Sequence, residues 1–230
     1  MSDARASRRA LLALLLLVPA PSIGTAMAMW VSPGPVGKAV YFGSKLWLLA
    51  LPAFWLLVVE RRRPSWSRPA HGGMLIGLVS GLVIGVGSLL AYRLGWHGRI
   101  DASALLEIAA KNQFDRPAVY LGFAAYITLV NSLLEEYVWR WFVVSRCKAL
   151  FSPRVAVLAG AVFFTLHHII ALRTYLPWSL TLLAAGGVCV GGLLWGWMYV
   201  RYRSIWPGFV SHALVDVAVF TIGWLLLFGE

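Results

Sequence analysis

Apolar runs of roughly 20 residues follow one another along most of the chain, separated by short segments rich in Arg, Pro and Gly. A transmembrane helix needs about 20 predominantly apolar residues. The pattern therefore predicts an all-α, polytopic membrane helix bundle with about seven transmembrane helices. The predicted spans are residues 10–30, 40–59, 73–94, 117–144, 155–172, 178–200 and 205–228.

The first apolar run fits two interpretations. It is either a spanning helix bent at Pro19 and Pro21, or a signal peptide, because Ala26-Met27-Ala28 resembles a small-residue cleavage site. Basic residues precede the run, as both interpretations require. We favour the retained helix, and the choice does not change the topology of the later spans.

Small residues predict where helices pack closely. Four glycines recur at four-residue spacing in the third span, and another four lie in the sixth. These are Gly73, Gly77, Gly81 and Gly85, and then Gly187, Gly191, Gly192 and Gly196. Between the third and fourth spans, residues 102–114 predict a short helix at the membrane surface.

Composition supports a membrane protein. The chain is 60% hydrophobic and only 13% charged, whereas about a quarter of a soluble domain is charged. The formal net charge of +11 comes from basic clusters between apolar runs. We interpret these clusters as orientation signals and not as a nucleic-acid surface. Cys147 and Cys189 lie far apart in apolar surroundings and are expected to be packing residues.

The basic residues also predict the orientation. Twelve Lys or Arg fall on the side of the N-terminus and seven on the other side, where we place Lys38 and Lys45. The positive-inside rule therefore puts the N-terminus in the cytoplasm. We divide the chain into a three-helix membrane region with the surface segment, residues 1–116, and a second membrane region, residues 117–230, which contains the last four spans.

The Asp, Glu and His residues that fall within spans are confined to the last four spans. Such residues are rare at membrane depth and indicate a functional site by default; the alternative is a structural network of ion pairs. At 1.5 Å per residue from the cytoplasmic arginines, three of them lie about 14–21 Å deep and can share one layer. The six residues are Glu135, Glu136, His167, His168, His212 and Asp216.

The fourth span carries two adjacent carboxylates with different surroundings. In a helix, residues four apart share a face, so Glu136 lies with Ser132 and can pair with Arg140. Glu135 shares its face with Asn131 and has no partner on its own helix. An unpaired carboxylate in a membrane is costly, so Glu135 needs a partner elsewhere or a chemical role.

The fifth and seventh spans supply the histidines. His167 and His168 diverge by about 100°, so we expect only one of them to point at the site. His212 and Asp216 share a face, where the carboxylate can orient the imidazole. The three carboxylates and one arginine sum to a charge of −2, which requires protonated groups or a bound metal.

Three motifs occur in order, each on its own span: Glu-Glu-x-x-x-Arg at 135–140, Phe-x-x-x-His at 164–168 and His-x-x-x-Asp at 212–216. Together they resemble the CPBP family of intramembrane proteases, the CAAX proteases and bacteriocin-processing enzymes, also called the Abi family. The resemblance covers residues 117–228.

The resemblance implies roles for these residues. Glu135 activates a water for attack on a peptide carbonyl, assisted by His168, while His212 and Asp216 line the oxyanion side. The family has Asn or Asp at the last position. An ionised Asp cannot donate a hydrogen bond, so Asp216 must be protonated, orient His212 or bind a metal. The expected supporting residues are Glu136, Arg140, Asn131 and His167.

Two points stay open. Phe163 and His167 also fit Phe-x-x-x-His; we assign the catalytic role to His168 because a bulky residue commonly precedes the family histidine. The cofactor is either none or a divalent metal such as zinc. If a metal binds, its expected ligands are Glu135, His168 and His212, since the chain lacks the His-Glu-x-x-His motif of many zinc proteases.

We therefore predict a peptidase, glutamate- or metal-dependent, that hydrolyses a membrane-associated or lipid-modified polypeptide. The short loops favour a bacterial cytoplasmic (inner) membrane. The alternative is a non-catalytic membrane partner or bacteriocin-immunity protein with the same fold. A proton-coupled transporter ranks last, because transporters usually show related repeats in both halves and here the polar residues occupy one half.

Overall fold

The computed structural model of the chain describes residues 2–63, 65, 67–69, 72–96 and 102–229. The protein is 86% helical, and no strand occurs among these residues. Seven helices in this part are long and apolar enough to cross a membrane, which confirms the predicted class and number. The chain is therefore an integral membrane protein. The seven helices are Ala4–Val31, Pro35–Val59, Met74–Gly95, Pro117–Cys147, Pro153–Tyr175, Trp178–Tyr202 and Trp206–Phe228.

Several spans contain wider, π-helical turns (labelled η) between α-helical segments. The first three spans comprise α1 (Ser2–Leu17), α2 (Pro19–Ala26), η1 (Met27–Val31), α3 (Pro35–Phe54), η2 (Trp55–Val59), α4 (Met74–Ala91) and η3 (Tyr92–Trp96). The fourth span comprises α6 (Pro117–Ala125), η4 (Tyr126–Asn131), α7 (Ser132–Glu135), η5 (Glu136–Val144) and α8 (Ser145–Cys147). The last three are α9 (Pro153–Tyr175), α10 (Trp178–Tyr202) and α11 (Trp206–Phe228).

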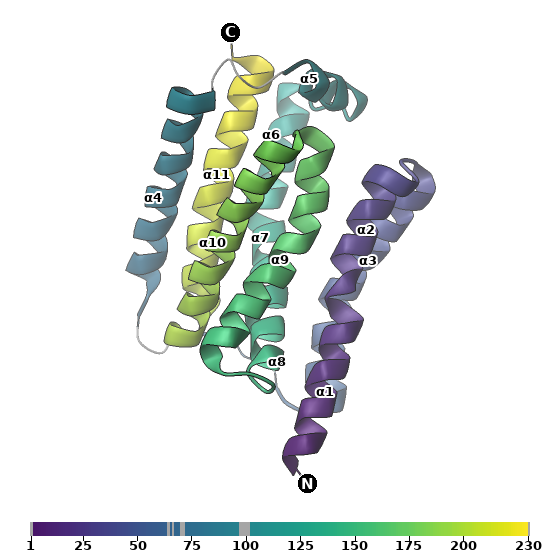
Figure 1. The fold of residues 1–230 in the computed structure, drawn as a ribbon, viewed down its shortest axis with the longest axis vertical. Coiled ribbons are helices and arrows are strands. Elements are labelled where there is room, and N and C mark those ends of the chain that lie inside the picture. The colour runs from purple at the N-terminus through teal and green to yellow at the C-terminus, as the bar shows by residue number, and fades with distance from the viewer. Residues whose placement is uncertain (1, 64, 66, 70–71, 97–101, 230) are drawn as a thin grey trace.

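The helices pack in pairs. The first two spans form a hairpin in which α2 lies against α3, at one side of the molecule (Figure 1). On the opposite side, α4 packs along α11, and α10 packs on α9. The fourth span passes between these groups and contacts helices of each. It therefore sits where side chains from several spans can converge.

The short helix α5 (Ala102–Lys111) lies at one end of the bundle, close to α11 (Figure 1). It begins at the same residue as the predicted surface helix, and it ends three residues before the predicted end. Its side chains Lys111 and Glu107 pair at 2.7 Å and are both exposed. The hydrogen bond from Lys111 lowers the pKa of the Glu107 carboxyl.

Glycines on α4 allow close contact with α11. Gly77, Gly81 and Gly85 are buried there, as predicted. A Cβ at Gly81 would lie 2.9 Å from the Leu214 side chain, so the two helices cannot approach this closely with a larger residue. One predicted packing position differs, because Gly187 faces open space. Gly73 precedes α4 in a left-handed conformation (φ +100°), and a Cβ there would lie 2.6 Å from the ring of Tyr202.

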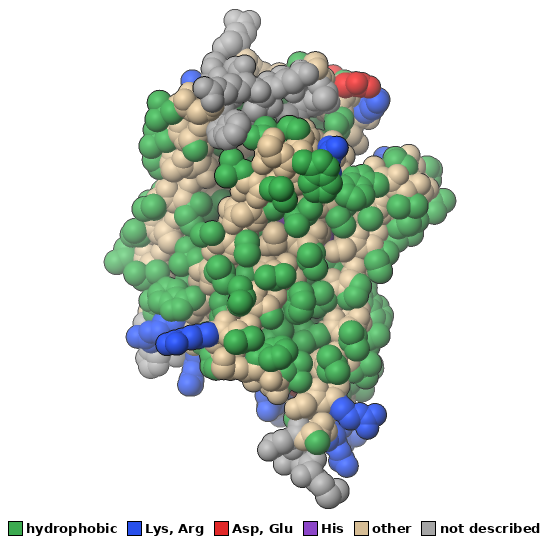
Figure 2. Space-filling view, in the orientation of Figure 1, with side chains coloured by type: hydrophobic (Ala, Val, Ile, Leu, Met, Phe, Trp, Pro, Cys, Tyr) green, Lys and Arg blue, Asp and Glu red, His purple; other side chains and the backbone are tan. Residues whose placement is uncertain are grey.

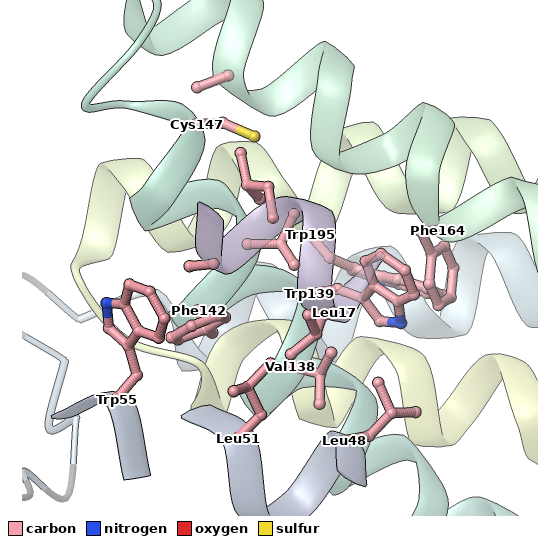
Figure 3. Close-up of a cluster of buried hydrophobic side chains, with 14 of the residues drawn as sticks. Leu17, Leu48, Leu51, Trp55, Val138, Trp139, Phe142, Cys147, Phe164 and Trp195 are labelled. Atoms are coloured by element: carbon pink, nitrogen blue, oxygen red, sulfur yellow. The ribbon is translucent and has the colours of Figure 1, made fainter. Parts of the chain in front are cut away.

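The hydrophobic core joins the first two spans to the fourth, fifth and sixth spans. Leu17 of α1 and Leu51 of α3 pack with Trp139 and Phe142 of the fourth span (Figure 3). Phe164 of α9 and Trp195 of α10 complete the cluster. The aromatic residues of this core are also the walls of the polar site described below.

The surface matches a bilayer environment. Large apolar side chains are exposed along the sides of the bundle, and the Lys and Arg side chains on the face drawn in Figure 2 gather mainly at one end. At the cytoplasmic end by our orientation, Arg146 pairs with Glu60, which ties the end of the fourth span to the end of the second. Lys45, which the count of basic residues grouped with the side opposite the N-terminus, lies within the second span, whose predicted bounds already contained it.

Candidate active site

The site is built around one turn of the fourth span. Ser132, Glu135 and Glu136 are all buried there, at the junction of α7 and η5. The continuation of the helix in wider turns changes the angle between successive side chains only modestly, so Glu135 and Glu136 still face different neighbours. Helices α9 and α11 supply those neighbours.

Glu136 is fully enclosed and already has two partners. Its Oε1 lies 3.3 Å from Arg140 Nε and 3.2 Å from His212 Nδ1. Gly208 of α11 leaves room for the other oxygen, because a Cβ at that position would collide with it. This carboxylate is therefore held by a helix-internal ion pair and by a ring from another span.

Aromatic faces enclose the guanidinium of Arg140. Its Cζ lies 4.4 Å from the centroid of the Phe164 ring and 5.0 Å from that of Trp195. A cation over a desolvated aromatic face is stabilised by the ring quadrupole. The predicted pairing of Glu136 with Arg140 is thus a buried structural unit that links three spans.

Glu135 lacks such a partner on its own helix and instead contacts two histidines across helices. One carboxylate oxygen lies 3.8 Å from His167 Nε2 of α9, and the other lies 3.6 Å from His212 Nε2 of α11. The side chain is 7% exposed. Both distances exceed a direct hydrogen bond, so the carboxylate lies beside the two imidazoles without a short bond to either.

The two histidines of α9 both reach the site, which corrects the expectation that only one of them could. Ligand atoms of Glu135, His167 and His168 all lie within 4.8 Å of one another. Two neighbouring side chains on a helix diverge at Cβ, but long rings can turn back toward a common point. Their ring centroids are 4.2 Å apart.

The surroundings of the two rings differ. His168 Nδ1 lies 2.9 Å from the carbonyl oxygen of Phe164, so Nδ1–H donates there and Nε2 keeps a lone pair. The His167 ring stacks on Trp139 at 5.5 Å, and its Nδ1 has no hydrogen-bond partner among the described residues. His168 is therefore fixed in one tautomer by the backbone, whereas His167 is fixed by aromatic packing.

His212 lies between all three acidic side chains. Besides its contacts with Glu136 and Glu135, its Nε2 lies 3.9 Å from Asp216 Oδ1. The ring stacks on Trp195 at 4.0 Å with an interplanar angle of 14°. The indole in turn donates to Ser211 Oγ at 3.0 Å. The stacking fixes the plane of the imidazole, so both nitrogens point at fixed positions.

Asp216 contacts the fourth span through Ser132. Ser132 Oγ lies 2.5 Å from Asp216 Oδ2 and 2.9 Å from the carbonyl oxygen of Ile127. A hydroxyl carries a single proton and both neighbours are potential acceptors. A proton on the Asp216 carboxyl, donated to Ser132, satisfies all three oxygens at once. A protonated carboxyl is the first of the three options that the sequence left for Asp216, and it stays a prediction.

One residue of the site was missed by the sequence analysis. Lys45 of α3 donates from Nζ to Asn131 Oδ1 at 2.6 Å, and Asn131 precedes Glu135 by one helical turn. A lysine in the middle of an apolar span is the signal that could have identified it. The predicted catalytic and supporting residues thus occupy one region, with Lys45 as an addition.

The donor set fits a divalent metal. One carboxylate and two imidazoles at this mutual distance are typical of zinc ligands, which include Asp or Glu oxygen and His nitrogen. The compact group contains His167 in place of His212 of the predicted set. Because the same atoms also suit a bound water, the geometry fits both alternatives left by the sequence, which are a site without a cofactor and a site with a divalent metal.

Comparison with known proteins gives one finding for this region. The family model for Rce1-like type II CAAX prenyl endopeptidases matches residues 117–218, from the first residue of α6 to just beyond Asp216. No curated protein and no solved structure matches the chain significantly. The matched segment contains the fourth span, α9, α10 and the polar half of α11. This match supports the resemblance to the CPBP family of CAAX-type proteases for residues 117–218.

Proposed function

We propose that the protein is an intramembrane endopeptidase that cleaves a membrane-associated or lipid-modified polypeptide, with Glu135 as the general base. One observation carries this proposal. Glu135 and Glu136 are adjacent and buried, yet Glu136 is engaged by Arg140, while Glu135 faces two histidines at distances beyond a direct hydrogen bond. A buried carboxylate next to a water is what hydrolysis requires.

In the proposed reaction, a water between Glu135 and His168 attacks the peptide carbonyl. Its proton passes to Glu135 as the C–O bond forms. The tetrahedral intermediate carries an oxyanion, which His212 stabilises, because a protonated ring that donates Nδ1–H to Glu136 can donate Nε2–H to the oxyanion. Glu135 then returns the proton to the leaving nitrogen as the C–N bond breaks.

Asp216 supports this arrangement in two ways. Through Ser132 it is tied to the same turn of the fourth span as Glu135. Its other oxygen lies beside His212. A neutral Asp216 reduces the uncompensated negative charge of the site, which would otherwise be costly at membrane depth. We therefore assign Asp216 as a positioning residue and not as a second base.

A divalent metal such as zinc, if bound, would be held by Glu135, His167 and His168 and would supply Lewis-acid activation of the water. The roles of His212, Asp216 and the Glu136–Arg140 pair are the same with and without a bound metal.

We place residues 117–230 as the catalytic core. The first 116 residues complete the bundle, because α4 packs along α11 and the first span joins the core cluster.

We also propose a setting in a bacterial cytoplasmic membrane, with the N-terminus in the cytoplasm. The concentration of basic loops on that side supports this orientation. The site then lies within the membrane, where lipid-anchored or membrane-spanning chains can reach it. Water and polar groups at that depth are tolerated only where they line a protein cavity.

The test compares cells that carry the wild-type protein with cells that carry Glu135→Gln. Membrane proteins are isolated from both, and their N- and C-terminal peptides are enriched and identified. The proposal expects at least one membrane polypeptide that is cut only with the wild type. Identical termini under conditions in which the gene has a phenotype would favour the non-catalytic partner or immunity role instead.

A further inference from the structure

A small polar cavity lies at the end of the bundle that our orientation places in the cytoplasm. It is separate from the candidate active site, because Ser145 in its wall lies nine residues beyond Glu136 on the fourth span. Its volume is about 290 Å³. Ligand sites in proteins range upward from about 300 Å³, so the cavity has room for a small polar group. Its polar lining residues are Glu60, Arg62, Ser145, Arg146 and Tyr199.

The ionisable groups that line the cavity carry a net positive charge. They are two arginines, Arg62 and Arg146, and one carboxylate, Glu60. Arg146 pairs with Glu60, so these two charges compensate each other. Arg62 has no ion-pair partner in the part of the chain that the structure describes. The cavity therefore keeps one uncompensated positive charge, which a bound anion would neutralise.

Arg146 has a buried donor that lacks an acceptor. Its Nε is closed off from solvent and has no hydrogen-bond partner among the described residues. Its Nη1 is occupied by Glu60, and its Cζ lies 5.3 Å from the centroid of the Phe142 ring, so the plane of the guanidinium is held from two sides. A buried donor without an acceptor is costly. Phosphate oxygens are acceptors that match the fork of donors on an arginine.

Two hydroxyls add further donors. Ser145 Oγ and Tyr199 Oη lie 2.9 Å apart, and one of them donates to the other. Each hydroxyl carries a single proton, so this bond leaves one proton for a ligand. The backbone of Arg62 is fixed beside the cavity, because its N–H donates to the Leu56 carbonyl oxygen at 2.9 Å. Side chains from the ends of three spans can thus donate to one anion.

We propose that this cavity binds the phosphate of an anionic phospholipid from the cytoplasmic leaflet. The cavity lies at headgroup level, because the three spans that form it end nearby, at Val59, Cys147 and Tyr202. Leu57 and Val58 precede this level on the second span and are more than half exposed, so acyl chains have an apolar surface beside the cavity. Basic pockets between helices on the cytoplasmic side are typical sites for anionic headgroups.

The experiment measures lipid binding to the full-length protein, purified in a neutral detergent, by native mass spectrometry. Phosphatidylglycerol and phosphatidylcholine with identical acyl chains are titrated separately, and the fraction of protein with one bound lipid gives each Kd. We expect phosphatidylglycerol to bind about tenfold more tightly, the factor that one charge-assisted hydrogen bond supplies. Phosphatidylglycerol should also raise the thermal unfolding midpoint, whereas inorganic phosphate added without lipid should leave it unchanged.

Two neighbouring arginines provide a matched pair of variants. Arg62→Gln removes the uncompensated charge and should lower the affinity for phosphatidylglycerol to that for phosphatidylcholine. Arg63→Gln removes the same charge from the next residue, which is exposed and does not line the cavity, and should leave the Kd unchanged. Arg146→Lys keeps the charge but lacks Nε and the planar fork, so it should also weaken binding. Because Arg62 is exposed, Arg62→Gln should keep the lipid-free unfolding midpoint, and its loss of binding then reports on the ligand and not on the fold.

Three outcomes would overturn the proposal. Equal binding of the two lipids would show that the cavity does not select an anionic headgroup. Equal weakening by Arg62→Gln and Arg63→Gln, or full binding by Arg62→Gln, would indicate a general attraction of the basic surface to anionic lipid. A rise of the unfolding midpoint with inorganic phosphate that equals the rise with phosphatidylglycerol would assign the cavity to a free phosphate ion.

Discussion

At the scale of single residues, the two adjacent glutamates differ by what surrounds them. Glu136 pairs with Arg140 and His212, whereas Glu135 faces two imidazoles at distances beyond a direct hydrogen bond. The spacing of Glu136 and Arg140 on one helix was enough to predict this difference from the sequence. The identity of the groups that approach from other spans required the structure, because no local pattern specifies which helices pack together.

The histidines of α9 give a residue-scale prediction. His168→Ala should lower kcat/KM by about 10²–10⁴, because it removes the nitrogen whose lone pair faces the water. His167→Ala should cause a smaller loss, since its ring mainly packs on Trp139. Steady-state cleavage assays on the two purified variants check this order. A larger loss for His167→Ala would reverse the assignment that we made from the sequence.

At the scale of helices, the fourth span is stabilised by a buried ion pair and α11 by contact with glycines. Neither feature is visible as a hydrophobic pattern, but both had a sequence signal: a charge pair four residues apart and glycines four residues apart. The span boundaries were predicted well because a long apolar run has few other structures available in a membrane. The approach of both His167 and His168 to the same site was not predicted, because it depends on how the two rings rotate.

The ion pair predicts a stability effect. Arg140→Ala removes the guanidinium from the buried carboxylate of Glu136 and leaves His212 as its one remaining partner. Removal of one partner of a buried ion pair costs about 3–5 kcal/mol. The midpoint of thermal unfolding in detergent should therefore fall clearly. Lys111→Ala is the matched control, because it breaks a pair with the same spacing that is fully accessible to solvent, and its midpoint should stay unchanged. Equal midpoints for all three proteins would show that the buried pair is not structural.

The α4–α11 contact predicts a packing effect. Gly81→Ala places a Cβ within 2.9 Å of α11, and overpacking of this kind costs about 1–3 kcal/mol. Because α11 carries His212 and Asp216, cleavage should weaken as well. Gly87→Ala on the same helix meets open space and should be neutral. The unfolding midpoint and the cleavage rate are measured for both variants. A Gly81→Ala variant that matches the wild type in both would contradict the tight packing of α4 on α11.

At the scale of the whole molecule, seven spans put the two ends of the chain on opposite sides of the membrane (Figure 1). Hydropathy predicted this arrangement fully. The sequence analysis did not identify Lys45 as a charged residue at membrane depth, however, because the count of basic residues by side grouped it with the loop residues. A polar residue inside a span is better treated first as a candidate for function.

The orientation predicts the behaviour of reporter fusions. With the N-terminus in the cytoplasm, alkaline phosphatase fused after residue 229 should be active and a fluorescent protein fused there should be dark. The same reporters placed after residue 203, in the basic loop before α11, should behave in the opposite way. Fluorescence at the C-terminal fusion would invert the proposed topology and the side from which the substrate enters.

The central claim is that Glu135 performs the chemistry while its neighbour maintains the structure. The most direct test uses purified wild type, Glu135→Gln and the exposed control Glu107→Gln in liposomes, with the substrate that the terminal-peptide comparison identifies. Cleavage and the unfolding midpoint are measured on the same preparations. We expect Glu135→Gln to lose cleavage with an unchanged midpoint and Glu107→Gln to match the wild type. Cleavage by Glu135→Gln at the wild-type rate would contradict the account.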